Sequence, residues 1–182
     1  MSRKKLLASL LVAAVAVVPV AAAKGGAGSS ASAFSPKTLK GSWSGTWKNL
    51  TFGTSGAIKA SFATPSRGRK LKVTLDFDGS VFGCQDPPAA AITLPKGQGS
   101  NKWSAGGFTL NGPSLAFGQR TIRYSHRTRK VTGKGANPPC AQGLTWTMSG
   151  SVSRTYRRLT ATVNITLPDG SKAVSELDVK KR

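Results

Sequence analysis

The sequence predicts an all-β fold, an antiparallel up-and-down β-barrel of about eight to ten strands. Apolar and polar residues alternate in several segments, and turn residues separate these segments at short intervals. The clearest alternation places Leu71, Val73, Leu75 and Phe77 on one face of the segment 70–77. No segment after residue 23 shows the 3.6-residue apolar period of an amphipathic helix. Short strands at this spacing form a sandwich or a barrel, and a sequential meander without a long return connection favours the barrel.

Further strands follow from the same alternation and from the turns between them. Three more segments alternate clearly, namely 58–62, 144–152 and 159–166. Weaker candidates are the segments 44–52, 91–94, 103–110, 114–117, 121–125 and 173–179. Residues that favour turns separate these segments at 53–56, 78–79, 111–113 and 168–170. The last of these turns joins the clearest hairpin of the chain.

The first 23 residues predict a signal peptide. A basic start at Arg3, Lys4 and Lys5 precedes an apolar run over 6–20, and small alanines at 21–23 complete the pattern of a cleavage site. A membrane anchor is the alternative, because the run approaches the shortest length that spans a bilayer. The alanines and the proline at position 19 favour cleavage. We therefore expect a secreted, extracytoplasmic protein with no transmembrane span after signal cleavage.

The rest of the chain divides into a leader and one domain. Residues 24–40 begin with a stretch rich in Gly, Ser and Ala, which buries too little apolar surface to offset the entropy of ordering. We expect this stretch to be a flexible leader. Residues 41–182 have a uniform, strand-rich composition and are expected to form a single β-barrel domain.

The first predicted strand of this domain carries two short motifs. Gly41 and Trp43 match the Gly-x-Trp of lipocalins, and the run from Gly45 through Thr46 and Trp47 to Asn49 matches the Gly-Thr-Trp-x-Asn of avidins. The strand thus resembles the opening strand of the calycin superfamily. That resemblance implies a barrel whose end is closed by a tryptophan and whose interior holds a small ligand. Biotin is not implied, because the later avidin motifs have no match in this chain.

The lipocalin resemblance also implies a basic residue from the last strand against the first-strand tryptophan. In this chain Lys180, Lys181 or Arg182 could take that place. None of the three is framed by a motif, so the sequence does not choose among them.

The leading functional interpretation is a non-enzymatic binding protein that holds a small apolar or amphipathic ligand in its barrel. The expected ligand-binding residues are Trp47, Phe62, Phe77 and Trp146. The alternative is a strongly basic cell-surface protein that adheres to polyanions and has a filled barrel. Large inward aromatics would fill the interior, whereas small residues such as Ala60 and Ala161 would leave room. The sequence contains both kinds of residue and leaves the choice open.

Cys84 and Cys140 are the two cysteines of the chain. Each lies next to a pair of prolines in a predicted loop, and an even number of cysteines in an exported chain favours a disulfide. A reactive thiol pair is the alternative, but neither a nearby base nor a Cys-x-x-Cys spacing is present. We expect the two cysteines to be bonded to each other.

The chain is strongly basic, with 27 Lys and Arg against 6 Asp and Glu and a net charge of +21. The densest cluster, expected to bind polyanions, consists of Arg120, Arg123, Arg127, Arg129, Lys130 and Lys134. A solvated hairpin without a specific partner is the alternative interpretation. Possible partners are a cell-wall polymer, an anionic lipid at a membrane surface or an acidic polysaccharide. Nucleic acid is disfavoured, because Tyr124 is nearly alone as an aromatic in this cluster.

The composition provides few acidic residues and one histidine that could act in catalysis. The one histidine, His126, has no acidic neighbour in the sequence, and Asp78 is explained by the turn that follows it. No spacing typical of metal ligands, phosphate loops or nucleophile elbows is present, so we expect no enzyme activity, no metal and no cofactor. An outer-membrane barrel is disfavoured, because the predicted strands are short and their aromatics are scattered.

Overall fold

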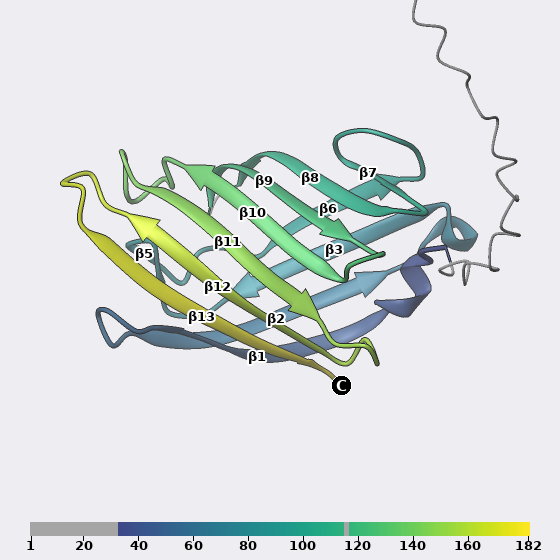
Figure 1. Cartoon of the computed structure of the whole chain (residues 1–182), viewed down its shortest axis with the longest axis horizontal. Coiled ribbons are helices and arrows are strands. Elements are labelled where there is room, and N and C mark those ends of the chain that lie inside the picture. The colour runs from purple at the N-terminus through teal and green to yellow at the C-terminus, as the bar shows by residue number, and fades with distance from the viewer. Residues whose placement is uncertain (1–32, 115–116) are drawn as a thin grey trace, which may run out of the picture. The chain divides into compact units, whose positions relative to one another are not determined.

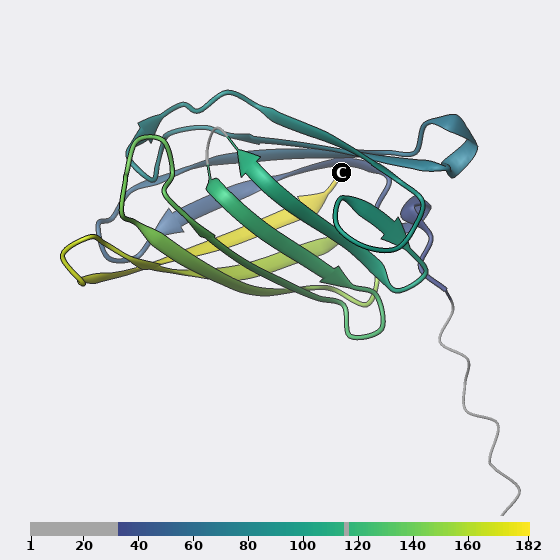
Figure 2. The same cartoon turned by 90° about the horizontal axis from the view of Figure 1, so that it is seen from above.

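The structure of the protein is a computed structural model that describes residues 33–114 and 117–182. The predicted signal peptide and most of the predicted leader lie outside the described residues. In the described part, eleven antiparallel strands form one strongly curled sheet (Figure 1). Seen from above, β8, β9 and β10 lie on one side of the interior and β1, β2 and β13 on the other (Figure 2).

Most of the described residues belong to strands. The strands of the large sheet are β1 (Gly41–Asn49), β2 (Ser55–Ala63), β3 (Lys70–Phe77), β6 (Ala90–Pro95), β7 (Lys102–Ser104), β8 (Gly107–Ser114), β9 (Gly118–Ser125), β10 (Lys130–Ala136), β11 (Thr145–Val152), β12 (Arg158–Thr166) and β13 (Lys172–Lys181). A separate hairpin pairs β4 (Ser80–Val81) with β5 (Cys84–Gln85), and the short 3-10 helices are η1 (Pro36–Thr38) and η2 (Ser66–Gly68). No helix among the described residues is both long and apolar enough to cross a membrane.

The strands follow a closed meander. The sheet order is β6-β3-β2-β1-β13-β12-β11-β10-β9-β8-β7, so consecutive strands are neighbours and the last strand returns to pair with the first. The two ends of the sheet, β6 and β7, meet at a bridge between Lys96 and Trp103, where the Gly97 amide donates to the Trp103 carbonyl at 2.8 Å. The all-β up-and-down barrel is therefore confirmed, with eleven strands where eight to ten were expected.

Three details of the strand prediction were wrong. The segment 103–110 forms two strands, β7 and β8, joined by a tight turn. Of the segment 114–117, Ser114 is the last residue of β8 and Phe117 lies in the turn before β9. Strand β10 was missed, because Gly133 and Gly135 interrupt its apolar alternation. Both glycines lie under larger side chains, and a Cβ built on Gly135 would come within 2.5 Å of the Trp146 ring. The sequence of β10 therefore shows no apolar alternation, because the Trp146 ring of the neighbouring strand β11 fills the space beside these glycines.

One end of the barrel is closed by the chain that leads into β1. We call it the closed end; it comprises residues 33–40, the β2–β3, β7–β8, β9–β10 and β11–β12 turns and the C-terminus. The expectation of a flexible leader through residue 40 was wrong for these residues. Phe34 is 4% exposed, its amide donates to the Ala105 carbonyl at 2.9 Å, and its ring lies 5.5 Å from that of Tyr124. An aromatic within a Gly/Ser/Ala-rich stretch supplies enough burial to order the chain there.

Trp43 lies at the closed end, as the calycin resemblance implies. Its indole nitrogen donates to the Leu39 carbonyl at 2.9 Å, and its ring meets the edge of Phe62 at 5.9 Å. Lys181 is its partner in the β1–β13 register and donates from Nζ to the Thr38 carbonyl at 3.2 Å. Of the three basic residues considered, Lys181 is thus the one that ties the last strand to the closing segment.

The other end, which we call the mouth, is bordered by the β1–β2 loop, the β4–β5 hairpin and the loops after β8, β10 and β12. Cys84 of the β4–β5 hairpin is bonded to Cys140 of the loop after β10, with their Cα atoms 5.2 Å apart. The predicted disulfide is confirmed. The disulfide joins two loops that are 56 residues apart in the sequence and that are not paired with each other in a β-sheet.

Candidate functional site

The barrel encloses a cavity of about 540 Å³. The cavity extends along the inner face, from Trp43 and Tyr124 at the closed end to Phe82 and Trp146 at the mouth. Its volume lies within the range of about 300–1,000 Å³ that is usual for small-molecule sites. All four residues predicted to bind a ligand, Trp47, Phe62, Phe77 and Trp146, are part of its lining. The barrel is therefore hollow, a question that the sequence left open.

The inward rows of the strands make this lining almost wholly apolar. On β2 the inward positions are Gly56, Ile58, Ala60 and Phe62, and on β12 they include Leu159, Val163 and Ile165. The polar lining residues are Asn49, Thr54, Ser80, Tyr124 and Ser175. Among the described residues, no acidic or basic side chain lines the cavity.

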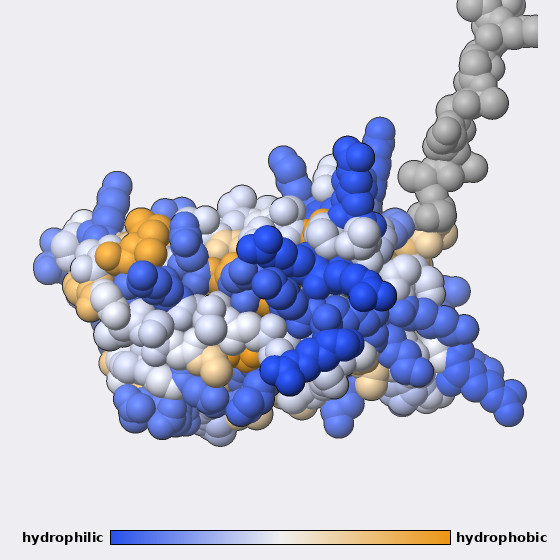
Figure 3. Space-filling view, turned by 90° about the horizontal axis from the view of Figure 1, so that it is seen from below, coloured by the Kyte–Doolittle hydropathy of each residue, from blue (hydrophilic) through white to orange (hydrophobic). Residues whose placement is uncertain are grey.

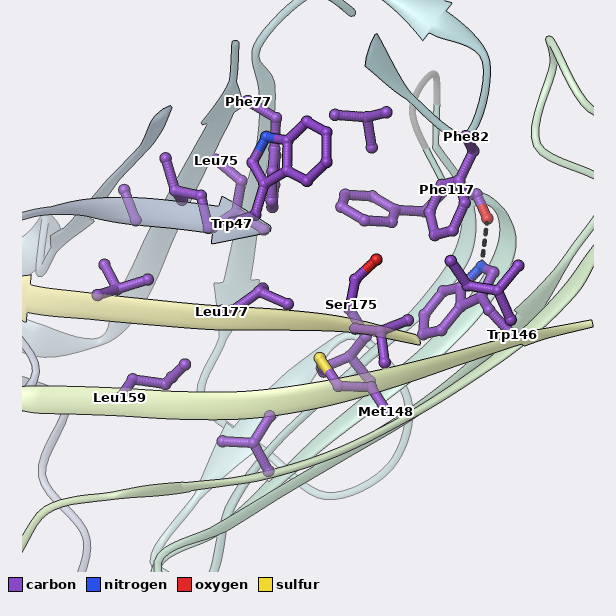
Figure 4. A pocket seen from close by; sticks show the side chains of 18 of the residues that line it. Trp47, Leu75, Phe77, Phe82, Phe117, Trp146, Met148, Leu159, Ser175 and Leu177 are labelled. Atoms are coloured by element: carbon purple, nitrogen blue, oxygen red, sulfur yellow. Dashed lines mark hydrogen bonds between the residues drawn. The ribbon is translucent and has the colours of Figure 1, made fainter. Parts of the chain in front are cut away.

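An aromatic cluster narrows the mouth (Figure 4). Phe82, at the tip of the β4–β5 hairpin, stacks on Trp146 with ring centres 6.2 Å apart, and Phe117 lies edge-on against Phe77 at 5.1 Å. The Trp146 indole nitrogen donates to the Phe117 carbonyl at 3.1 Å, which fixes the ring across the opening. Sequence reasoning missed Phe82 and Phe117, because both lie in turns where no period marks an inward face. Phe82 has a φ of +49°, a conformation set by the hairpin.

Trp47 lies beside this cluster and is held from two sides. Its indole nitrogen donates to the Asp78 carbonyl at 2.9 Å. Gly56, its partner on β2, leaves the room for that bond, since a Cβ there would come within 2.6 Å of the indole nitrogen. The position of Trp47 is thus fixed by backbone contacts before any ligand enters.

The few polar groups at the mouth differ in what they do. Asn49 uses its side-chain oxygen to accept hydrogen bonds from the amides of Thr51 and Phe52 at 2.9 and 3.0 Å, so it stabilises the β1–β2 loop. Ser175 directs its hydroxyl toward the cavity (Figure 4). Phe52 also lines the mouth, yet it is 59% exposed and leaves an apolar ring at the rim.

Tyr124 is the polar lining residue at the closed end. It is 2% exposed, and its hydroxyl has no hydrogen-bond partner among the described residues. Burial, with a smaller contribution from the neighbouring Tyr156 hydroxyl, raises the pKa of Tyr124 well above its ordinary value. The charged form of this side chain is therefore strongly disfavoured in the folded protein.

This raised pKa predicts alkaline destabilisation. An unfolded tyrosine loses its proton near pH 10, whereas folded Tyr124 keeps it, so stability falls as pH rises above about 10. Absorbance at 295 nm should show that Tyr124 keeps its proton until the barrel unfolds. Tyr124→Phe should remove that part of the pH dependence and leave stability at neutral pH unchanged or higher, because it deletes an unpaired buried hydroxyl. Ionisation of Tyr124 while the barrel is still folded would contradict the expectation.

The six residues of the predicted basic cluster do not converge on one site. Arg123, Lys130 and Lys134 lie at exposed positions on β9 and β10, and Arg127 is exposed in the turn between these strands. Arg129 is half-buried in the same turn. The six residues are spread from the mouth to the closed end.

Arg120 differs from the other five. It is two residues before the cavity-lining Ile122 and therefore shares its inward row, near the mouth. Its guanidinium donates to the Pro113 carbonyl at 2.6 Å and the Gly112 carbonyl at 3.3 Å, and burial lowers its pKa. These contacts give Arg120 a structural role between β8 and β9.

The described residues offer no metal centre. Within 33–114 and 117–182, no group of three His, Cys, Asp or Glu side chains lies close enough to hold a metal ion. His126 stacks on Tyr156, whose hydroxyl lies 3.3 Å from Nδ1, so the imidazole packs at the closed end, away from the mouth.

Comparison with known proteins shows similarity at the level of the fold. No family model and no curated protein matches this chain. Among solved structures, it resembles a protein of unknown function from the DUF3598 family of Nostoc punctiforme, with 9% identity and a TM-score of 0.50. The match covers 83% of this chain and 50% of that protein, so this chain spans half of the length of the protein it matches.

Two further structures are similar over most of the chain. The siderocalin Ex-FABP shows 12% identity and a TM-score of 0.32, covering 80% of this chain and 74% of its own. Odorant binding protein OBP1 shows 9% identity and a TM-score of 0.33, covering 82% and 75%. The chain forms the antiparallel up-and-down β-barrel that its sequence predicts, and the comparisons leave its ligand open.

Proposed function

We propose that this protein is a secreted binding protein that holds a small apolar or amphipathic molecule inside its barrel. The observation that carries the proposal is the cavity of about 540 Å³ with its almost wholly apolar lining. Water in such a space finds few hydrogen-bond partners, whereas an apolar molecule gains about 25 cal/mol for each Å² of apolar surface that it buries. The cavity thus selects apolar surface over polar surface.

The polar residues at the mouth favour an amphipathic ligand oriented with its polar part outward. Asn49, Thr54, Ser80 and Ser175 lie at that end, and the lining that residues 33–114 and 117–182 provide contains no acid, lysine or arginine. A neutral polar group could therefore be hydrogen-bonded near the mouth while the apolar part extends inward. A lining of this kind is suited to holding an apolar molecule by the burial of its surface.

Export is supported by two independent features. The sequence of residues 1–23 has the pattern of a signal peptide, and the Cys84–Cys140 disulfide is of a kind that persists in oxidising, extracytoplasmic compartments. A protein in such a compartment can collect apolar molecules that dissolve poorly in water.

The proposal predicts that filling the cavity abolishes binding. Ala60 lines the cavity on β2, and Ala63, at the end of the same strand, is exposed. Ala60→Phe should reduce binding of the neutral fluorophore N-phenyl-1-naphthylamine at least tenfold, because the new ring occupies the space that the probe needs. Ala63→Phe is the matched control and should bind as the wild type does. Probe emission and quenching of tryptophan fluorescence give the affinity.

The outcome separates cavity binding from adsorption. Equal binding by both variants would place the probe on the surface and overturn the proposal. Circular dichroism checks that Ala60→Phe is folded, and Ala60→Leu, which adds less volume, provides a milder variant. Native mass spectrometry of protein purified from its own host should then reveal a bound ligand as added mass.

A further inference from the structure

The charges of this chain are separated along the barrel axis. Between Asp86 and Asp169 the sequence contains no acidic residue. Five of the six acids of the chain lie toward the mouth: Asp76 and Asp78 at the end of β3, Asp86 after β5, Asp169 in the β12–β13 turn and Glu176 opposite Lys48 on β1. The sixth, Asp178, is paired with Arg158 at 2.7 Å.

The closed end carries exposed cations on almost every segment that forms it. Lys37 lies in η1 and Lys40 follows it, and Arg67 and Arg69 lie in the β2–β3 turn. The remaining segments contribute Arg127 and Lys130 at the β9–β10 turn, Arg154 and Arg157 at the β11–β12 turn, and Lys180 and Arg182 at the C-terminus. Seen from below, strongly hydrophilic side chains gather over the half of the molecule that holds this end (Figure 3).

We infer that the closed end docks on an anionic lipid surface, with the mouth directed away from it. The cations project from five separate segments around a rounded end, which suits contact with a flat, negatively charged surface. Each Lys or Arg near such a surface contributes to binding within about one screening length, and acids at the opposite end favour the same orientation. Of the predicted basic cluster, Arg127, Arg129 and Lys130 belong to this surface.

The distribution of exposed aromatic side chains favours a lipid surface over nucleic acid. The large hydrophobic residues that are exposed, Leu50 and Phe52, lie at the mouth, so among the described residues the closed end offers no exposed aromatic on which a base could stack.

The test measures binding to vesicles with a charge-matched pair of variants. Arg67→Gln/Arg127→Gln/Arg154→Gln removes three exposed cations from the closed end, and Lys48→Gln/Lys134→Gln/Lys172→Gln removes three exposed cations nearer the mouth. The probe is co-sedimentation with vesicles of phosphatidylcholine containing one third phosphatidylglycerol. We expect wild-type binding to these vesicles, none to pure phosphatidylcholine, and loss of binding at about 1 M salt, where the screening length falls to about 3 Å.

The variants decide whether the site is the closed end. The closed-end variant should bind about a hundredfold more weakly, and the mouth-side control should lose less than about tenfold. Equal losses would mean that only the net charge matters and would overturn the proposal. Retention on heparin without binding to the anionic vesicles would also overturn it, since the partner would then be a soluble polyanion. Unchanged probe binding in the cavity confirms that the variants are folded.

Discussion

Removing the disulfide with Cys84→Ala/Cys140→Ala is expected to lower the free energy of unfolding by about 4 kcal/mol. The bond closes a loop of 56 residues, and the chain-entropy model assigns about that much to the freedom that the unfolded chain regains. Urea denaturation followed by circular dichroism measures the change. A marginally stable barrel would then be partly unfolded at physiological temperature.

The same variant tests whether the disulfide also holds the mouth. Phe82 is two residues before Cys84, and Gly83 packs against the Cys140 carbonyl, so the bond fixes the hairpin that places Phe82 on Trp146. A bound fluorophore should therefore dissociate faster from the variant, which stopped-flow fluorescence measures under conditions where it remains folded. Gln85→Ala/Gln142→Ala, in the same two loops, is the control and should lose less than about 1 kcal/mol. A disulfide-free variant as stable as this control would refute the expectation.

Replacing Trp43 by alanine is expected to cost about 3–5 kcal/mol of unfolding free energy. The side chain is 3% exposed, its ring packs against Phe62, and its indole nitrogen satisfies the Leu39 carbonyl. The substitution removes a large buried apolar surface, leaves a cavity that the closed end cannot fill, and deprives a backbone carbonyl of its partner. Urea unfolding followed by circular dichroism avoids the change in fluorescence that the lost tryptophan itself produces.

The matched comparison for Trp43 uses Phe52, an aromatic residue in the β1–β2 loop at the mouth. Phe52→Ala removes a ring that is mostly in water and should change stability by no more than about 0.5 kcal/mol. Trp43→Phe keeps the packing but loses the hydrogen bond, and should fall between the two. If Trp43→Ala were as mild as Phe52→Ala, the closed end would not depend on the tryptophan of the Gly-x-Trp motif.

The sequence by itself determined the architecture of this protein. The period-two alternation at 70–77 and 159–166 requires strands with one apolar face, and the turn residues between segments allow only short connections. The Gly-x-Trp spacing at Gly41 and Trp43 indicated the strand that closes the barrel, and the paired cysteines indicated the disulfide. These features depend on residues that are close in the chain or on residue types with few alternatives.

Only the tertiary structure decided what the inside and the surface can do. Whether the barrel is hollow depends on the combined size of the inward side chains from many strands. A small residue leaves empty space at Ala60, whereas neighbouring side chains cover Gly133. The apolar periodicity of the sequence could not identify Phe34 and Phe82 as core residues. Each lies in a loop and packs against an aromatic that is distant in the sequence. Arg120 and Arg127 belong to one basic run, yet the hairpin carries them to opposite ends of the barrel. A pattern along the chain reports which face a residue occupies, whereas volume and charge separation arise from contacts between segments that only folding brings together.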